Sequence, residues 1–234
     1  MSGLVVAIPV FEGRGRVGDV VRGARASGLP VVVVDDGSSD GSGDEAAEAG
    51  ATVLRHSANR GKGAALQTAF AWAERQGAEA VLTLDADGQH DPAEIPTLVA
   101  AHRARPEGLV IGVRRFDEMP RRSQVGNRIS TWWISRYARR EHRDTQSGFR
   151  VYPRTLYAGA RFRTSRFDTE TELVLRAAKL GVPLVEVPIR TIYFSSSDAA
   201  HPTHFHGFRD TLRIMRLVFF SPLWHVERRA PAGE

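Results

Sequence analysis

The sequence predicts an α/β protein with a mostly parallel central sheet flanked by helices. Short, β-branched-rich apolar runs at 4–8, 31–34 and 80–84 are predicted to be buried strands, and helix-compatible segments separate them. Strands that alternate with helices are typical of a parallel sheet with helices on both faces. Ligands of such sheets bind at the carboxyl ends of the strands. Acidic residues follow all three runs, so the fold class also predicts where the functional site lies.

The first half supplies most of the predicted elements. The first strand is expected to stop at Pro9, because proline lacks a backbone N–H for the ladder. Asp91 and Pro92 are expected to be the N-cap and the first residue of a helix. The other elements expected here are strands at 51–54 and 109–112 and helices at 16–26, 42–50 and 64–76.

The second half is less regular and contains basic amphipathic segments, the last of which predicts a C-terminal amphipathic helix. The elements expected here are helices at 121–140, 168–180 and 208–220 and a strand at 184–192. Gly181 is expected to close the middle helix, and Pro188 interrupts the strand pattern. No linker is long enough to divide the chain, so a single domain is expected over 1–234.

Composition excludes several function classes. The chain has no cysteine, which rules out disulfides, thiol nucleophiles and thiolate metal sites. It begins without the pattern of a secretory signal, and no apolar run is long enough to span a bilayer. We therefore expect a cytoplasmic protein, with attachment to a membrane surface left open.

The basic residues are nearly all arginine and are concentrated in one region. Lys62 and Lys179 are the only lysines among 32 Lys and Arg, and the formal net charge is +5. Nine arginines lie between Arg114 and Arg143. Such a block favours phosphates, anionic lipid or nucleic acid.

Asp85-Ala86-Asp87-Gly88-Gln89 is the segment that points most directly to chemistry. It directly follows the run 80–84, and side chains of a strand alternate between its two faces. If the extended geometry persists, Asp85 and Asp87 point the same way. Two carboxylates on one face repel each other unless a cation lies between them, and hard oxygen ligands suit Mg²⁺ or Mn²⁺ bound together with substrate phosphates.

With its other motifs, the chain resembles the family-2 glycosyltransferases of the GT-A fold, and most closely the branch of polyprenol-phosphate (dolichol-phosphate) mannosyl- and glucosyltransferases. The resemblance covers roughly 4–193, and the order of the motifs makes chance unlikely. The motifs are Ile8-Pro9-Val10-Phe11-Glu12, Val34-Asp35-Asp36-Gly37-Ser38, Asn59-Arg60-Gly61-Lys62-Gly63, Asp85-Ala86-Asp87-Gly88-Gln89, Gly112-Val113-Arg114, Ser147-Gly148-Phe149-Arg150 and Glu186-Val187-Pro188-Ile189.

The resemblance implies a GT-A, Rossmann-like sheet with a nucleotide-sugar-binding half over 4–115 and an acceptor-binding half over 116–225. It implies an inverting, metal-dependent transfer of a hexose from a UDP- or GDP-linked donor to a lipid-linked acceptor, most simply polyprenyl phosphate, at the inner face of the membrane. The residues that it implies for the donor are Pro9, Glu12, Val34 and Asp36 around the nucleoside, Asp85, Ala86, Asp87 and Gln89 at the Mg²⁺ or Mn²⁺ ion and the diphosphate, and Arg114 on phosphate. Arg150 is implied to face the acceptor phosphate.

The acceptor decides whether a general base is needed. A phosphate monoester is already anionic, whereas a hydroxyl must lose its proton to a carboxylate within hydrogen-bond reach. Asp144 is the first candidate for that base, because it shortly precedes the Ser147 motif, and Glu170 and Glu172 are the others. The mannosyltransferase branch also has basic residues soon after the Glu-Val-Pro motif; the basic candidates here are His201, His204, His206 and Arg209.

Other interpretations stay open at this point. The segment 59–63 is either a phosphate cradle at a helix start or a simple loop. The histidines of 201–206 are more simply phosphate or solvent contacts than a zinc site. Trp132 and Trp133 belong either to the core or to a helix lying at a membrane surface. Transfer to a lipid or glycan hydroxyl, a nucleotidyltransferase and a nucleic-acid-binding module are the alternative functions.

Overall fold

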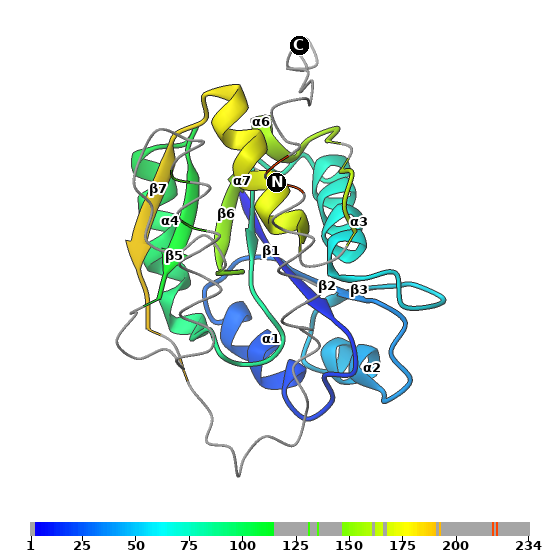
Figure 1. Ribbon diagram of the computed structural model, residues 1–234. Helices are drawn as coiled ribbons and strands as arrows, with labels where there is room; N and C mark the ends of the chain where they lie inside the picture. Colours follow the sequence, from blue (N-terminus) through cyan, green and yellow to red (C-terminus); the bar gives the residue numbers. More distant parts are fainter. Residues whose placement is uncertain are drawn as a thin grey trace.

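The central sheet of the computed structural model has seven strands (Figure 1). The structure describes residues 3–114, 131, 135, 147–160, 162–165, 168–190, 192, 217 and 219. The strands are β1 (Leu4–Val10), β2 (Val31–Asp35), β3 (Thr52–Arg55), β4 (Ala80–Thr83), β5 (Leu109–Val113), β6 (Arg150–Pro153) and β7 (Leu184–Pro188). Their order across the sheet is β3-β2-β1-β4-β6-β5-β7.

The sheet is mostly parallel, as the sequence predicts. β1 pairs in parallel with β2 and with β4, β2 pairs in parallel with β3, and β5 pairs in parallel with β7. β6 is the exception, since it runs antiparallel to both of its neighbours, β4 and β5. The carboxyl ends of β1, β2 and β4 therefore meet at one edge of the sheet, where ligands of parallel sheets bind.

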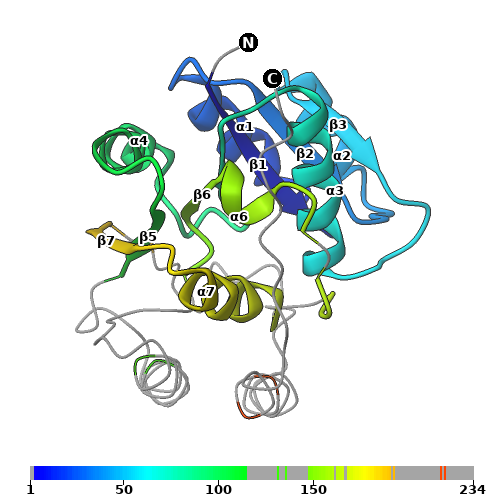
Figure 2. The ribbon, with the colours of Figure 1, turned by 90° about the horizontal axis from the view of Figure 1, so that it is seen from above.

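Helices cover both faces of this sheet (Figure 2). The helices are α1 (Val17–Arg25), α2 (Ser42–Glu48), α3 (Lys62–Arg75), the 3₁₀ turn η1 (Pro92–Glu94), α4 (Ile95–Ala104), α6 (Arg154–Tyr157) and α7 (Asp168–Leu180). Val5 and Ala7 of β1 pack in the core cluster that contains residues of α3 and α7, whereas Val6 and Ile8 pack in the cluster that contains residues of α1 and α4. Because side chains of a strand alternate between its two faces, β1 contributes residues to the hydrophobic cores on both sides of the sheet.

The first strand is longer than predicted, because it continues through Pro9 to Val10. Val6 N donates to Pro30 O and Asp36 N donates to Val10 O, so these residues bond toward β2, and Ala7 bonds toward β4 by accepting from Leu84 N. Because the backbone groups of successive residues in a strand bond alternately to the two neighbouring strands, those of Pro9 face β4. The pairing with β4 has already ended at Ala7. The missing N–H of proline is therefore not required there.

The fourth predicted strand is slightly shorter than expected. β4 ends at Thr83, and Ala86 and Asp87 form a turn before Gly88, whose φ is +76°. The expectation that an extended chain points Asp85 and Asp87 the same way is therefore wrong in its premise. A turn rather than strand alternation brings the two carboxylates to the same edge of the sheet.

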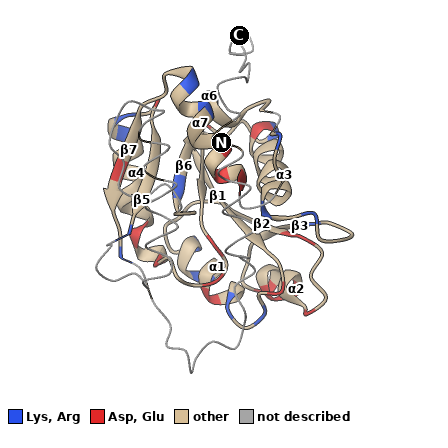
Figure 3. Ribbon diagram, viewed as in Figure 1, with Lys and Arg blue, Asp and Glu red and all other residues tan. Residues whose placement is uncertain are grey.

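β6 was not predicted, and it lies in the middle of the sheet. Its four residues, Arg150 to Pro153, are all buried, although a charged first residue and a proline at the end give no strand pattern. The inner strands β1 and β4 carry no charge, whereas β6 brings an arginine among them (Figure 3). Pairing with β4 and β5 on both sides, rather than local propensity, makes this segment a strand.

The predicted helices at 121–140 and 208–220 lie almost wholly outside the described residues. Of them, only Thr131, Ser135, Leu217 and Phe219 are described, each in helical conformation. Leu217 is buried in the core cluster that contains residues of α3 and α7, and Phe219 is 72% exposed. Nowhere in the described part of the chain is a helix both long enough and apolar enough to cross a bilayer.

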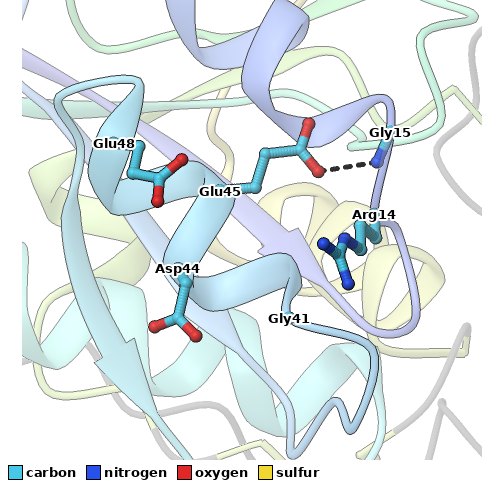
Figure 4. A pocket seen from close by; sticks show the side chains of 6 residues that line it. All are labelled: Arg14, Gly15, Gly41, Asp44, Glu45 and Glu48. Atoms are coloured by element: carbon cyan, nitrogen blue, oxygen red, sulfur yellow. Dashed lines mark hydrogen bonds between the residues drawn. The ribbon is translucent and has the colours of Figure 1, made fainter.

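The start of α1 is held by a side chain of a different helix. Glu45 of α2 accepts hydrogen bonds from Gly15 N at 2.6 Å and from Gly18 N at 2.9 Å. The Arg16 side chain, at the N-cap position, makes no capping hydrogen bond. Glu45 instead satisfies the N–H of Gly18, one of the donors that the first turn of a helix leaves unpaired, and that of Gly15 just before the helix. Figure 4 shows Glu45 in a hollow that Asp44 and Glu48 also line. Carboxylates dominate this hollow, which makes it a poor site for an anionic ligand.

Glu45→Ala is expected to lower the free energy of unfolding by about 1 kcal/mol, the usual cost of losing a helix cap. Glu48→Ala on the same helix is the matched control, because Glu48 is exposed and makes no hydrogen bond to α1. Urea denaturation of both variants measures the difference. Equal midpoints for the two variants would show that the Glu45 contacts contribute nothing to stability.

Candidate active site

Asp85 lies at the centre of the candidate site, directly beyond the carboxyl end of β4. Its Oδ1 is 2.7 Å from Nζ of Lys62, the first residue of α3. The same ammonium is 3.0 Å from Oε1 of Glu170 on α7. The side chains of Lys62, Asp85 and Glu170 are 15%, 23% and 8% exposed, so this is a mostly buried ion triad rather than a surface salt bridge. It joins three elements that are distant in the sequence.

The electrostatics of the triad are strong because water is largely excluded. Burial alone would lower the pKa of Lys62, but the negative charges of Asp85 and Glu170 raise it above its usual range. Burial alone would raise the pKa of Asp85, but Lys62 and His90 hold it well below its usual range. Lys62 and Asp85 are therefore both charged at neutral pH.

The other oxygen of Asp85 faces the segment that enters β6. A Cβ on Gly148 would lie 2.5 Å from Asp85 Oδ2, so only glycine allows this close approach. Thr83 holds the segment in place by donating from Oγ1 to Gly148 O at 2.7 Å. His90 Nε2 lies 3.7 Å from Asp85 Oδ2, and its ring packs against Phe149 with centroids 5.4 Å apart. Protein groups thus surround Asp85 on both sides.

Asp87 has a different environment from Asp85. Its Oδ1 accepts a hydrogen bond from Gln89 N at 2.9 Å, and Arg16 Nη1 donates to its backbone carbonyl at 3.3 Å. Burial, and then the charge of Asp85, raise the pKa of Asp87 above its ordinary value. The pKa values of the two carboxylates of the motif are therefore shifted in opposite directions, and for Asp87 burial and the charge of Asp85 outweigh the positive charges of His90 and Lys62.

The residues of this motif fit a hard divalent cation, provided that the ligand supplies most of the coordination. The described residues contain no group of three or more His, Asp or Glu arranged to hold a metal ion. Burial and the charge of Asp85, which together raise the pKa of Asp87, both disfavour its ionised form, and a cation bound there would stabilise that form. Mg²⁺ is commonly held by one or two carboxylates together with substrate phosphates. Asp87, with Gln89 beside it, suits that arrangement better than Asp85, whose Oδ1 contacts Lys62.

Asp36, beyond the end of β2, organises the loop that leads to Lys62. Its Oδ1 accepts from Arg60 N at 3.0 Å, and its Oδ2 accepts from Gly61 N at 2.7 Å. His56 Nδ1 lies 2.6 Å from Asp36 Oδ1, and His56 Nε2 lies 2.9 Å from Thr68 Oγ1. Asp36 is 2% exposed. The structure therefore shows this carboxylate holding the segment 59–63, and its predicted contact with the base or ribose stays a prediction.

The remaining residues predicted for the donor lie near the same edge of the sheet. Glu12 has a φ of +51°, and its Oε1 accepts from Ser39 N at 2.8 Å, which ties the loops after β1 and β2 together. Pro9 and Val34 are register partners in these two strands. The Val34 side chain is fully buried, so it supports the site from within the core.

Two further predicted residues lie close by, one after each of two strands. Ala86, beyond β4, is 8% exposed, and Arg114 directly follows β5. The residues predicted for the donor thus lie along the same edge of the sheet, and their contacts with a ligand stay predictions.

Arg150, predicted to face the acceptor, is fully buried at the start of β6. Its Nε donates to Ser147 O at 2.6 Å and its Nη1 donates to Glu170 O at 2.8 Å. These contacts fix the Gly148 segment and the start of α7, which together flank Asp85. The described role of Arg150 is therefore to position the site, and its contact with an acceptor stays a prediction. Asp144, the predicted base, lies outside the described residues.

The structure distinguishes the two candidate bases of α7. Glu172 accepts hydrogen bonds from Arg163 N, Thr164 N and Thr164 Oγ1, and so caps the loop before α7. Glu170 instead contacts Lys62 within the site. The sequence singled out Glu170 only as a candidate base and Lys62 only as part of the possible phosphate cradle 59–63, and it did not single out His90. The available signal for Lys62 was that it stands in a glycine-rich motif that follows a strand.

His56→Ala is expected to lower the free energy of unfolding by about 2 kcal/mol, because it removes a partner of the buried Asp36 carboxylate. Arg60→Ala is the control, since the Arg60 side chain is exposed and its bond to Asp36 comes from the backbone. It should change stability by less than about 0.5 kcal/mol. Thermal or urea unfolding measures both, and a His56 variant no less stable than the Arg60 variant would contradict the assignment.

The mostly parallel sheet, with acidic residues beyond the carboxyl ends of β1, β2 and β4, agrees with the GT-A fold class that the motifs imply. The family model for glycosyl transferase family 2 matches residues 5–160. The chain therefore belongs to glycosyl transferase family 2 and is a hexosyltransferase, as its motifs indicate.

Sequence relatives include proteins that act on polyprenyl phosphates. The undecaprenyl-phosphate mannosyltransferase of Micrococcus luteus is 32% identical over 176 residues, with 68% of this chain and 70% of the relative covered. A UDP-N-acetylglucosamine–dolichyl-phosphate N-acetylglucosaminyltransferase of Methanococcus voltae is 30% identical over 175 residues, with 70% and 68% covered. The uncharacterized protein MJ1222 of Methanocaldococcus jannaschii is 31% identical over 231 residues, with 92% and 93% covered.

A solved structure confirms the predicted GT-A fold. The glucosyl-3-phosphoglycerate synthase of Mycobacterium tuberculosis, crystallised with Mn²⁺, UDP and phosphoglyceric acid, matches with a TM-score of 0.71. The match covers 94% of this chain and 77% of that one, at 18% sequence identity. At this identity the likeness shows the fold alone.

Proposed function

We propose that this protein is an inverting, metal-dependent hexosyltransferase that moves a sugar from UDP or GDP to polyprenyl phosphate. The observation that carries the proposal is the pair of unlike carboxylates beyond β4, of which Asp85 is paired with Lys62 while burial and Asp85 raise the pKa of Asp87. This site lies where parallel sheets bind ligands. The names of two relatives, which act on undecaprenyl and dolichyl phosphate, support the acceptor class.

The chemistry requires stabilisation of a leaving diphosphate. The acceptor oxygen attacks the anomeric carbon as the bond from that carbon to the diphosphate breaks, so the configuration inverts and a nucleoside diphosphate leaves. A divalent ion held at Asp87 and Gln89 would neutralise the charge that develops on the diphosphate. Lys62 adds a fixed positive charge beside that place. Asp36 holds the loop that leads to Lys62, and so sets where this charge lies.

The described carboxylates favour a phosphate acceptor over a hydroxyl. A hydroxyl acceptor needs a base, and neither carboxylate of α7 is well suited. Glu172 is engaged with the loop before α7, and Glu170 is paired with the Lys62 ammonium. A phosphate monoester needs no such base. Transfer to a lipid or glycan hydroxyl is the second candidate, with Asp144 as its base.

A lipid-linked acceptor would place the enzyme at a membrane surface. We propose peripheral attachment to the inner face of the cell membrane through the basic segments 114–143 and 208–220. Arginine-rich segments with interspersed aromatic residues favour anionic headgroups. Within the proposed division, 4–115 binds the donor and 116–225 binds the acceptor.

Asp87→Asn is expected to reduce turnover by about 10²-fold or more, because it removes charge stabilisation at the leaving group. Stability should change little, since the substitution is nearly isosteric. Asp19→Asn is the matched control: Asp19 lies on α1 in an exposed salt bridge with Arg22. Transfer of radiolabelled hexose and thermal unfolding measure the two effects. Turnover of the Asp87 variant equal to that of the control, or full activity in excess chelator, would contradict the metal role.

The acceptor class is tested by the chemistry of the product. Purified enzyme is supplied with UDP-glucose or GDP-mannose and either polyprenyl phosphate or a lipid with a free hydroxyl. The proposal predicts a labelled product from polyprenyl phosphate that mild acid cleaves, as expected for a sugar phosphodiester. An acid-stable glycoside formed only from the hydroxyl lipid would establish the second candidate instead.

A further inference from the structure

Lys62 occupies a position that the proposed function does not by itself explain. Its ammonium lies between carboxylates of two separate elements, 2.7 Å from Asp85 Oδ1 and 3.0 Å from Glu170 Oε1. The site therefore already contains one positive charge of its own, and that charge is directed at the first carboxylate of the motif expected to hold a divalent ion.

Close packing at the starts of two helices fixes this arrangement. A Cβ on Gly63 would overlap Oγ1 of Thr169 on α7 and would lie 2.6 Å from the backbone carbon of Ser165. Ala64 N also donates to Ser165 O at 3.2 Å. The first turn of α3 is thus pressed against the first turn of α7, which places Lys62 next to Glu170. A flexible lysine loses its conformational freedom here before any ligand arrives.

An ammonium and a divalent ion compete for the same carboxylate oxygen. The Lys62 ammonium lies 2.7 Å from Asp85 Oδ1, and a divalent ion bound by Asp85 at this position would need the same oxygen as a ligand. At this burial the repulsion between the two positive charges is only weakly screened. Asp85 Oδ2 does not offer an open alternative, because Gly148 packs closely against it. A divalent ion that used Asp85 would therefore have to displace Lys62 or accept its charge nearby.

We propose that Lys62 is an internal counter-cation that competes with the divalent ion for Asp85, and that Glu170 is the positioning residue that anchors it. Without nucleotide, Lys62 occupies Asp85 and the divalent ion is bound mainly by Asp87. The nucleotide-free site therefore binds the ion weakly. The ion is retained when the donor diphosphate supplies further oxygen ligands. This inference rests on the proposed function only in assuming that the site takes a divalent cation.

The experiment measures Mn²⁺ binding directly, without donor or acceptor, by the loss of the electron paramagnetic resonance signal of free Mn²⁺. Lys62→Met should bind Mn²⁺ about tenfold more tightly than the unmodified protein, because one competing unit charge has gone from a poorly solvated site. Lys179→Met is the matched control: it makes the same substitution at the other lysine, near the end of α7, and should leave the affinity unchanged. Equal or weaker binding by the Lys62 variant would overturn the proposal.

A double variant separates competition from net charge and guards against misfolding. Lys62→Met leaves two mostly buried carboxylates without their cation, whereas Lys62→Met with Glu170→Gln removes one charge of each sign. The double variant has the same net charge as the unmodified protein, but Asp85 no longer has the Lys62 ammonium as its partner. It should bind Mn²⁺ more tightly than the unmodified protein, whereas Glu170→Gln alone should bind equally or more weakly. If the only role of Lys62 were to hold α3 against α7, the double variant would be less stable and its affinity for Mn²⁺ would not increase.

The Mn²⁺-binding results can be told apart from a failure of the proposed hexosyltransferase function. Hexose transfer is assayed separately, on the unmodified protein with donor and acceptor present. Absence of Mn²⁺ uptake by the unmodified protein and by both Lys62 variants would overturn this inference even if transfer occurs. Tighter uptake by the variants would support it even if the acceptor is a hydroxyl rather than a phosphate.

Discussion

The contact between Lys62 and Asp85 is the interaction on which the described site depends. It joins the first residue of α3 to the segment that follows β4, and Glu170 extends it to α7 at 3.0 Å. Removing one member of a buried ion pair leaves an uncompensated charge and is strongly destabilising. The three elements are therefore coupled by electrostatics as well as by packing, and the position of each carboxylate depends on the other two groups.

The surrounding contacts are consistent with a site that is organised before a ligand binds. Arg150 is fully buried and donates to the carbonyls of Ser147, which precedes the Gly148 beside Asp85, and of Glu170, whose side chain contacts Lys62. Asp36 holds the loop that ends at Gly61, directly before Lys62. Buried polar groups with all of these partners fix side-chain geometry. Preorganised charges of this kind would serve the proposed transfer of a sugar from a diphosphate.

The sequence predicted the fold well where local signals and tertiary structure agree. The end of α7 at Leu180, with Gly181 at a φ of +69°, matches the prediction because glycine marks a helix end. Asp91 caps the turn that begins at Pro92 by accepting from Ala93 N, as expected. β6 could not be predicted, since pairing with two neighbouring strands decides its conformation rather than any period in its sequence.

The chemistry of the candidate site was only partly visible in the sequence. The motif around Asp85 and Asp87 located the site at the end of β4, but spacing does not reveal that the two carboxylates differ. That difference arises largely from Lys62, 23 positions earlier in the chain, and from His90, which together lower the pKa of Asp85. Lys62 also contacts Glu170, far later in the chain. The resemblance implied an acceptor contact for Arg150, which stays a prediction, whereas its burial at the start of β6 and its bonds to the carbonyls of Ser147 and Glu170 were not visible in the sequence. Contacts that form only when distant segments pack cannot be inferred from local pattern.

The most direct test of this account is a crystal structure of the protein with Mn²⁺ and UDP, measured with anomalous scattering to locate the ion. The account predicts an anomalous peak bound by a carboxylate oxygen of Asp87 and by diphosphate oxygens, beyond the carboxyl end of β4. A peak elsewhere with the nucleotide bound, or a bound nucleotide without any ion near Asp87, would contradict it.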